Sequence, residues 1–168
     1  MDIRFDYDSA FESRGKLMDA AEDRLANAQT LDDIIAIVRA TARAVCSADG
    51  VTFVLHDCGY CHYVEKDAIA PLWKGQRFPS QSCISGWCMR HAETAVITDV
   101  FADPRIPHDV YRRTFVKSLV VTPVGRDAPV AAIGAYWSEK RIIAPREVAM
   151  IERLADAVAH AMPRAMAA

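Results

Sequence analysis

Residues 83–124 read CISGWCMRHAETAVITDVFADPRIPHDVYRRTFVKSLVVTPV, and this stretch decides the fold. Pro104 and Pro107 exclude a long helix or strand from its centre. Three short elements fit around these prolines: a helix over residues 85–91, a strand over 95–97 and a helix over 108–115. The stretch closes on a β-branched run at residues 118–124, which predicts a well-formed strand.

Two β-hairpins are expected on either side of this stretch. Each joins two apolar runs through a polar turn: residues 50–55 with 60–64, and residues 118–124 with 130–137. Because hairpins of one small domain share a core, we expect both to pair in a single antiparallel sheet.

Helices are predicted at both ends of the chain. The first covers residues 9–28. The second begins at Thr30, where Asp33 completes a capping box ahead of a regular apolar face. The last begins at Pro145, a residue suited to a first helical turn, and runs to about Met162.

The element order is therefore helix, helix, hairpin, irregular middle, hairpin, helix. It predicts an α+β fold with a central antiparallel sheet of about five or six strands. The N- and C-terminal helices cover one face, and a roof of loops and short helices covers the other. Long ordered loops of this kind are usually functional, so we expect a pocket between the roof and the sheet.

The order of several short motifs resembles a GAF domain. They are I-S-G-W at 84–87, V-I-x-D at 96–99, D-P-R at 103–105, S-L-x-x-x-P-V at 118–124 and G-x-Y-W at 134–137. The closing segment RIIAPREVAMIERLADAVAHAM, residues 141–162, is similar to the acidic last helix of that family. In these motifs the sequence is most similar to GAF domains that precede bacterial sensor histidine kinases, including the HWE type.

The resemblance implies a GAF/PAS-like sensory domain over residues 31–162. It places a helix at residues 1–30 as a candidate dimer contact and leaves 163–168 as a tail. Members of the family bind cyclic nucleotides, bilins, haem or other small molecules, so the fold names no ligand and the cofactor is left unknown.

Composition excludes several classes of protein. A net charge of −2 gives no electrostatic footprint for nucleic acid. The longest apolar runs are too short to cross a membrane, and the acidic N-terminus lacks a secretory signal. We therefore expect a cytoplasmic protein, without a nucleic-acid or membrane partner, whose five cysteines are mostly reduced.

Four of the cysteines suggest an alternative site. Cys58, Cys61 and His62 match the C-x-x-C-H pattern of covalent haem attachment. Together with Cys83 and Cys88, the first two also provide four thiolates for zinc or an iron–sulfur cluster. The competing interpretation is that these thiols are small core residues. A cysteine-based redox or metal sensor is thus kept as the second hypothesis.

Two activities of GAF-fold relatives each require a cysteine that this chain does not have at the corresponding position. Free methionine sulfoxide reductases place a cysteine near the position of Cys88, but they also use a later thiol, and no cysteine follows Cys88. Phytochrome-like domains attach bilin through a cysteine in the helix that corresponds to residues 108–115, where this chain has only His108. Because no kinase segment is present either, the chain is predicted not to be an enzyme.

The pocket is expected to be lined from the irregular middle of the chain. Its apolar candidates are Trp73, Phe78, Trp87, Phe101, Tyr111 and Phe115, together with Tyr136 or Trp137 from the sheet. Its polar candidates are Asp99, Asp103, Arg105, His108 and Lys117. Arg105 and Lys117 would suit an anionic ligand. Local roles are the alternative, since Asp99 and Asp103 are good turn residues and Arg105 has acidic neighbours.

The function predicted from these features is sensing. A small molecule or signal is bound, and helix packing transmits the event to a partner, in a two-component kinase pathway. One stripe of the last helix has the 3–4 spacing of a homodimer seam, although the same face could pack on the domain's own sheet: Val148, Ile151, Ala155, Val158 and Met162. A ligandless dimerisation module is the third hypothesis.

Overall fold

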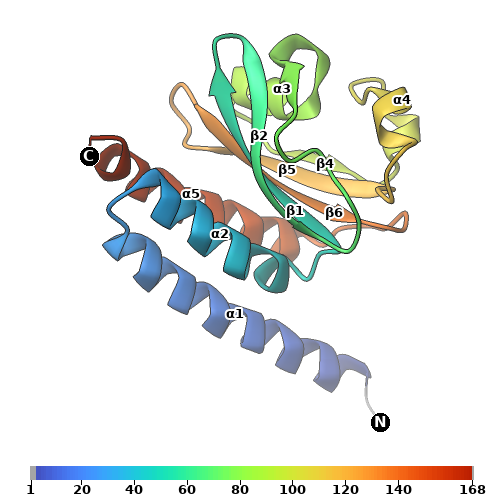
Figure 1. The fold of residues 1–168 in the computed structure, drawn as a ribbon. Helices are drawn as coiled ribbons and strands as arrows, with labels where there is room; N and C mark the ends of the chain where they lie inside the picture. Colours follow the sequence, from blue (N-terminus) through green and yellow to red (C-terminus); the bar gives the residue numbers. More distant parts are fainter. Residues whose placement is uncertain (1–2, 168) are drawn as a thin grey trace.

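The computed structural model describes residues 3–167 and the side chains of residues 7–167. The strands are β1 (Gly50–Asp57), β2 (Tyr60–Ala68), β3 (Arg77–Pro79), β4 (Ala95–Ile97), β5 (Ser118–Val124) and β6 (Ala131–Trp137). The helices are α1 (Ile3–Asn27), α2 (Leu31–Cys46), α3 (Ile84–His91), α4 (His108–Tyr111) and α5 (Pro145–Ala167), with short 3₁₀ turns η1 (Ser80–Ser82) and η2 (Val100–Ala102). The predicted α+β class is confirmed (Figure 1).

One six-stranded antiparallel sheet has the order β3-β2-β1-β6-β5-β4. Both predicted hairpins form, and they join where β1 pairs with β6. The first hairpin turns at Cys58 and Gly59, whose φ angles of 49° and 84° fit a two-residue turn that follows the sheet twist. The two hairpins therefore build the centre of the sheet, and the short strands β3 and β4 form its edges.

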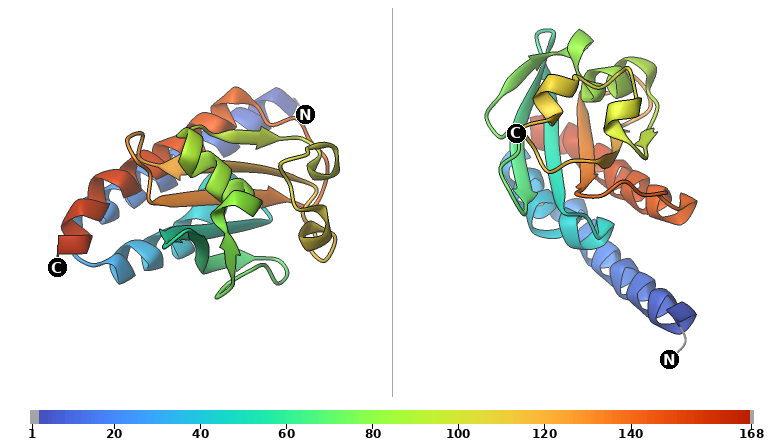
Figure 2. Two further views of the ribbon diagram at one scale, coloured as in Figure 1. Left: turned by 90° about the horizontal axis from the view of Figure 1, so that it is seen from above. Right: turned by 90° about the vertical axis from the view of Figure 1, so that its right-hand side faces the viewer.

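Helices α2 and α5 cover one face of the sheet, and α1 packs on the outer side of these two helices; α3 and α4 lie on the other face of the sheet (Figures 1 and 2). The predicted capping box starts α2: the Asp33 backbone N–H donates to Thr30 Oγ1 at 3.1 Å, and the Asp33 carboxylate accepts from the Thr30 N–H at 2.9 Å. The predicted start of α5 at Pro145 is also confirmed.

Three helices differ by several residues from their predicted lengths. α1 begins before residue 9, and α5 passes Met162 and Pro163 to reach Ala167. A third, α4, stops at Tyr111 because the Thr114 N–H and hydroxyl both donate to the Tyr111 carbonyl oxygen and turn the chain there. Residues 163–167 are thus part of α5.

Arg164 gives a physical reason for the longer α5. Its guanidinium donates to the carbonyl oxygens of Leu25, Ala26 and Ala28, at 3.1, 2.9 and 2.8 Å. Leu25 and Ala26 belong to the last turn of α1, where carbonyl groups lack a partner within the helix, and Ala28 follows the end of α1 directly. The end of one helix therefore caps the end of another.

Replacing Arg164 with methionine is expected to lower the free energy of unfolding by about 1 kcal/mol, because three helix-end carbonyls lose a charged donor. Arg126→Met is the control, since the Arg126 side chain is 87% exposed. Urea titration of both variants checks the difference. Equal stability of the two would contradict the capping role.

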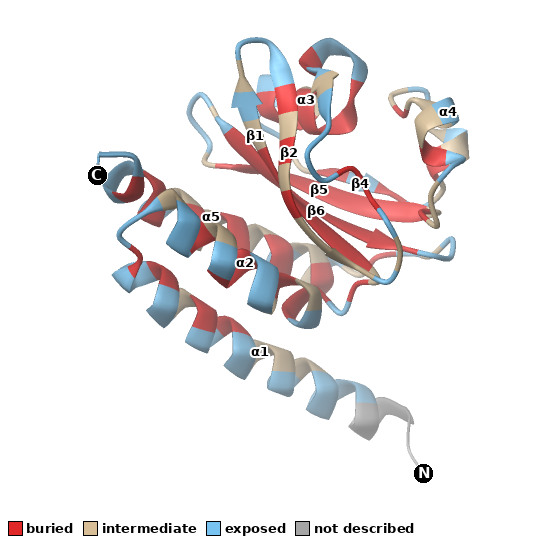
Figure 3. Ribbon diagram, viewed as in Figure 1, coloured by how far each residue is buried: buried red, intermediate tan, exposed pale blue. Residues whose placement is uncertain are grey.

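The sheet separates two apolar cores (Figure 3). Trp137 belongs to the core under the helices, and its neighbour Tyr136 belongs to the core under the roof, because successive strand residues face opposite sides. Ile151, Ala155 and Val158 of α5 are buried in the helix-side core. That stripe of α5 is therefore used within the chain and not as an exposed seam.

No helix among residues 3–167 combines the length and the apolar character that a membrane crossing requires.

Candidate functional site

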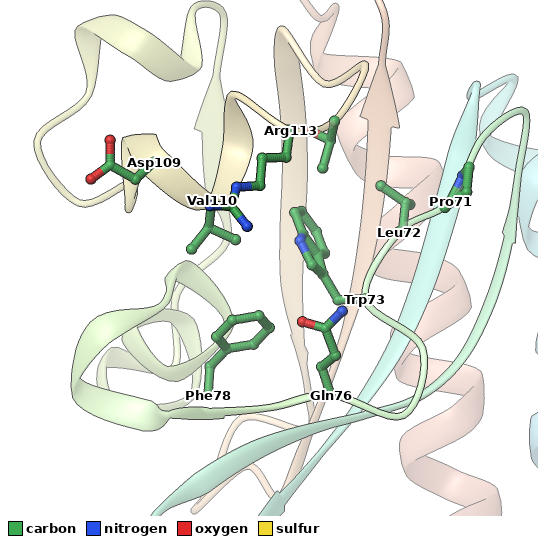
Figure 4. Close-up of a pocket in the computed structure, with 9 residues that line it drawn as sticks. Pro71, Leu72, Trp73, Gln76, Phe78, Asp109, Val110 and Arg113 are labelled. Carbon is green, nitrogen blue, oxygen red and sulfur yellow. The ribbon is translucent and has the colours of Figure 1, made fainter.

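The main pocket opens between the segment after β2 and the segment around α4, and it holds about 500 Å³ (Figure 4). Apolar side chains dominate its wall: Pro71, Leu72, Trp73, Phe78 and Val110. Polar groups complete it: Gln76, Asp109, Arg113 and Thr114. The volume and this mixture suit a small organic molecule.

An aromatic cluster forms the inner wall of the pocket. Trp73 is 5% exposed and lies against Tyr111 and Tyr136, with ring centroids 4.9 and 5.7 Å away. Tyr63 meets Trp73 edge to face at 5.5 Å. Because each ring is fixed by its neighbours, Trp73 forms a rigid wall and not a mobile flap.

Tyr136 connects this cluster to the sheet. Its hydroxyl lies 2.9 Å from Thr52 Oγ1 in a fully buried hydrogen bond. Burial raises the pKa of the Tyr136 phenol beyond its usual range. The phenol therefore stays neutral at physiological pH, and the pocket wall carries no charge at this point.

Arg113 provides the cationic group of the pocket. In Figure 4 its side chain reaches down beside Val110, toward the space between Trp73 and Phe78, whereas the Asp109 carboxylate points away. Asp109 instead pairs with Arg112 at the surface. Arg113 has no ion-pair partner within residues 7–167, so its charge is available to a ligand.

Tyr111 contributes a polar atom without a partner. Its ring is 3% exposed, and its hydroxyl is the one buried side-chain oxygen or nitrogen without a hydrogen bond among the described residues. Burial raises the pKa of the Tyr111 phenol well above its usual range, so the hydroxyl keeps its proton. An unpaired buried donor is costly, and this one lies behind Trp73, outside the residues that line the pocket.

The predicted ligand residues divide between this pocket and other places. Trp73 and Phe78 line it, and Tyr111 lies behind Trp73. Trp87 and Arg105 line a second pocket, with the Arg105 guanidinium 4.4 Å from the Trp87 ring. Phe115 packs beside the roof core, close to Gly50.

The remaining polar candidates have local partners. Asp103 pairs with Arg105 at 2.7 Å and accepts from its backbone N–H. Asp99 pairs with Lys140 at 2.8 Å and accepts from the Phe101 N–H. The His108 Nε2 lies 3.0 Å from the Asp103 carbonyl oxygen, and Lys117 lies over the Phe101 ring.

These contacts also lower two pKa values. For Asp103, the hydrogen bond from the Arg105 side chain is the largest cause; for Asp99, it is the hydrogen bond from the Lys140 side chain. Both carboxylates stay charged and bound to these bases, which matches the local roles that the sequence left open.

Several residues that line the main pocket were not predicted from the sequence. They are Pro71, Leu72, Gln76, Asp109, Val110, Arg113 and Thr114. Arg112 and Arg113 are both exposed, and only the path of the loop places Arg113 at the pocket. Proximity in sequence to Trp73 was the one available signal for the first three.

The four cysteines of the alternative site do not meet at one point. Cys58 is exposed at the hairpin turn, whereas Cys61, Cys83 and Cys88 are buried under the roof. Within the described part of the chain, no three His, Cys, Asp or Glu side chains are grouped to hold a metal ion.

A sheet with helices on one face and a pocket under a looped roof on the other defines a small-ligand-binding sensory fold. The family model of the GAF domain matches residues 28–162, and the chain therefore belongs to the GAF domain family. No curated protein is significantly similar to the chain in sequence.

Solved structures share this fold. The GAF domain of a phosphoenolpyruvate-protein phosphotransferase from Coxiella burnetii is 15% identical, with a TM-score of 0.81 over 94% of this chain and 96% of that one. The phycoerythrobilin-bound GAF domain of a cyanobacterial phytochrome is 19% identical, with a TM-score of 0.73 over 92% of this chain and 96% of that one.

One similar structure corrects a prediction. The free methionine-R-sulfoxide reductase from Neisseria meningitidis, solved with its substrate, is 16% identical, with a TM-score of 0.78 over 92% of this chain and 90% of that one. An enzyme therefore uses this fold over nearly the whole chain, and the prediction that the chain is not an enzyme is wrong. At such low identity the likeness shows the fold alone and assigns no reaction here.

Proposed function

We propose that this GAF domain is a sensory module that binds a small molecule in the pocket between Trp73 and Arg113. The observation that carries the proposal is a rigid aromatic wall facing an arginine without an ion-pair partner in the described structure. Such a wall suits a flat or apolar body, and the guanidinium suits a carboxylate or phosphate. The ligand class is therefore a small organic anion.

Strand β6 gives a physical route from the pocket to the helices. Tyr136 lies against Trp73 on the roof side, and Trp137 on the other side donates its indole N–H to the Ser47 carbonyl oxygen at the end of α2, at 2.9 Å. Because the aromatic cluster is rigid, a ligand that shifts it would move it as one body and would carry Tyr136 and Trp137 with it. We propose that this shift changes the packing of the helical layer.

The start of α5 lies on the same route. The Arg141 guanidinium lies over the Trp137 ring, 4.9 Å from its centroid, and donates to both carboxylate oxygens of Glu147, at 2.8 and 3.0 Å. Glu147 also accepts from the Ala144 N–H, which begins the helix. Both helices that flank the sheet thus contact Trp137 or its partner.

The proposed output is a signalling partner that reads the helical layer, in a cytoplasmic two-component pathway with a histidine kinase. The resemblance to GAF domains that precede such kinases supports this choice of partner. Tyr7 and Leu17 of α1 are exposed apolar residues, and they support a homodimer through that helix.

The test compares adjacent arginines. Arg113→Glu reverses the charge in the pocket, whereas Arg112→Glu changes a neighbour outside it. The wild-type protein and both variants are incubated with a bacterial metabolite extract, and retained molecules are identified by native mass spectrometry.

A retained anion should bind about tenfold or more weakly to Arg113→Glu, because a charged hydrogen bond becomes a repulsion. The Arg112→Glu variant should bind as the wild type does. Retention of no molecule by the wild type, or equal affinity in both variants, would reject the pocket as the sensory site.

A further inference from the structure

A second pocket of about 300 Å³ lies in the roof and shares no lining residue with the first. Cys83, Trp87, Arg90 and Arg105 line it. The Arg105 guanidinium is held over Trp87 by its ion pair with Asp103, 2.7 Å long. The wall of this pocket therefore combines one cysteine with two cationic side chains.

Cys83 is the N-cap residue of α3, directly before its first turn. The hydrogen bond from the Cys61 thiol lowers the pKa of Cys83, burial opposes it, and the Gly86 and Ser85 amides and the Arg90 charge lower the pKa further. Cys83 is mostly buried, with 7% exposure, and it is one of the residues that line the pocket. Cys83 thus combines a lowered pKa with a position on the wall of a pocket that a small molecule can enter.

Cys61 lies directly behind Cys83. It is fully buried on β2, opposite Phe78 of β3, and α3 packs against β2. Tyr63, two residues further along the same face of β2, lies 3.1 Å from Ser85 Oγ of α3 through its hydroxyl, so Cys61 also faces the start of α3, where Cys83 lies. The interaction with Cys83 is the largest cause that raises the pKa of Cys61, followed by burial, so Cys61 keeps its proton while Cys83 loses its own more readily.

The other three cysteines lack this combination. Burial raises the pKa of Cys88 to about 12, and its thiol donates to the Val121 carbonyl oxygen at 3.3 Å. Burial likewise raises the pKa of Cys46 to about 12, in the core on the helix side. Cys58 is exposed at the hairpin turn, outside both pockets.

We propose that Cys83 is an oxidisable site for small peroxides, and that Cys61 resolves the oxidised form as an intramolecular disulfide. The Cys83 thiolate attacks one peroxide oxygen, the O–O bond breaks, and the other oxygen leaves as water or an alcohol after taking a proton. Cys83 is then a sulfenic acid. The Cys61 sulfur attacks the Cys83 sulfur, the S–O bond breaks, and hydroxide leaves with the Cys61 proton as water. Overall, two thiols are oxidised and one peroxide is reduced.

The sequence offers matched controls for the test. Tryptic peptide 44–66 contains Cys46, Cys58 and Cys61, and peptide 78–90 contains Cys83 and Cys88. Each peptide thus carries a decoy thiol beside the proposed one. The reduced full chain is treated with equimolar hydrogen peroxide, alkylated, digested and analysed by mass spectrometry.

The expected product is the cross-linked pair of these peptides, reversed by dithiothreitol. It should form unchanged in Cys58→Ser and Cys88→Ser and fall about tenfold or more in Cys83→Ser and Cys61→Ser. In Cys61→Ser, dimedone should instead label Cys83, because the sulfenic acid has no partner.

Two results would overturn the proposal. One is a cross-link that persists in Cys83→Ser. The other is a wild-type protein in which peroxide oxidises Cys58, whereas Cys83 stays reduced and is fully alkylated afterwards. This second measurement uses the wild-type protein alone and so does not depend on the folding of any variant.

Discussion

Replacing Gly86 with alanine is expected to lower the free energy of unfolding by about 3 kcal/mol, because an added methyl group has no room. A Cβ atom at this position would lie 1.9 Å from the Ser80 carbonyl oxygen. That oxygen belongs to the backbone of η1, so α3 and η1 would have to separate. The glycine of the I-S-G-W motif is thus a packing requirement of the roof.

Gly15→Ala is the matched control. Gly15 lies within α1, and nothing lies within 4 Å of a Cβ atom built there. The same substitution should therefore stabilise the chain by about 0.5–1 kcal/mol, since alanine favours a helix over glycine. Urea titration of both variants measures the contrast. A Gly86→Ala protein as stable as the wild type would show that the roof is loosely packed.

Replacing Gly134 with alanine is expected to cost about 2–3 kcal/mol and to disturb the ligand pocket. The Tyr136 ring lies across Gly134, and an added Cβ would meet its hydroxyl oxygen at 2.3 Å and its Cζ at 2.6 Å. Because Tyr136 is fully buried, its ring cannot move into solvent. The displaced ring would lose its hydrogen bond to Thr52 and its contact with Trp73.

A double-mutant cycle separates this clash from a general effect on the strand. In a Tyr136→Leu background the large ring is gone, so Gly134→Ala should cost less by about 1 kcal/mol or more. Denaturant unfolding of the four proteins provides the coupling energy. Additive effects would mean that Gly134 serves the strand for a reason other than the tyrosine.

Local signals in the sequence predicted most of the fold. The turn at Cys58 and Gly59, the capping box of Thr30 and Asp33, and Pro145 each act within a few residues, so their sequence pattern determines their structure. The end of α5 was missed because its stabilising contact joins Arg164 to the end of α1, 136 residues away.

The site was less predictable for the same reason. Trp73 and Phe78 were found because large aromatic residues in a loop region have few places other than a core or a pocket. Arg113 has the same local sequence signature as Arg112, and only the course of the loop directs one into the pocket and the other to Asp109. Asp99 and Asp103 form ion pairs with Lys140 and Arg105, and His108 contacts the Asp103 carbonyl oxygen, so these three residues are not directed at a ligand.

The two sheet edges limit how copies of this domain can associate. β3 and β4 are three residues long, and β3 ends at a proline, which has no N–H to donate. Neither edge offers a template on which a foreign strand could extend the ladder. Polymerisation by strand addition is therefore disfavoured, so stable contacts between neighbouring copies are expected to be made by side chains.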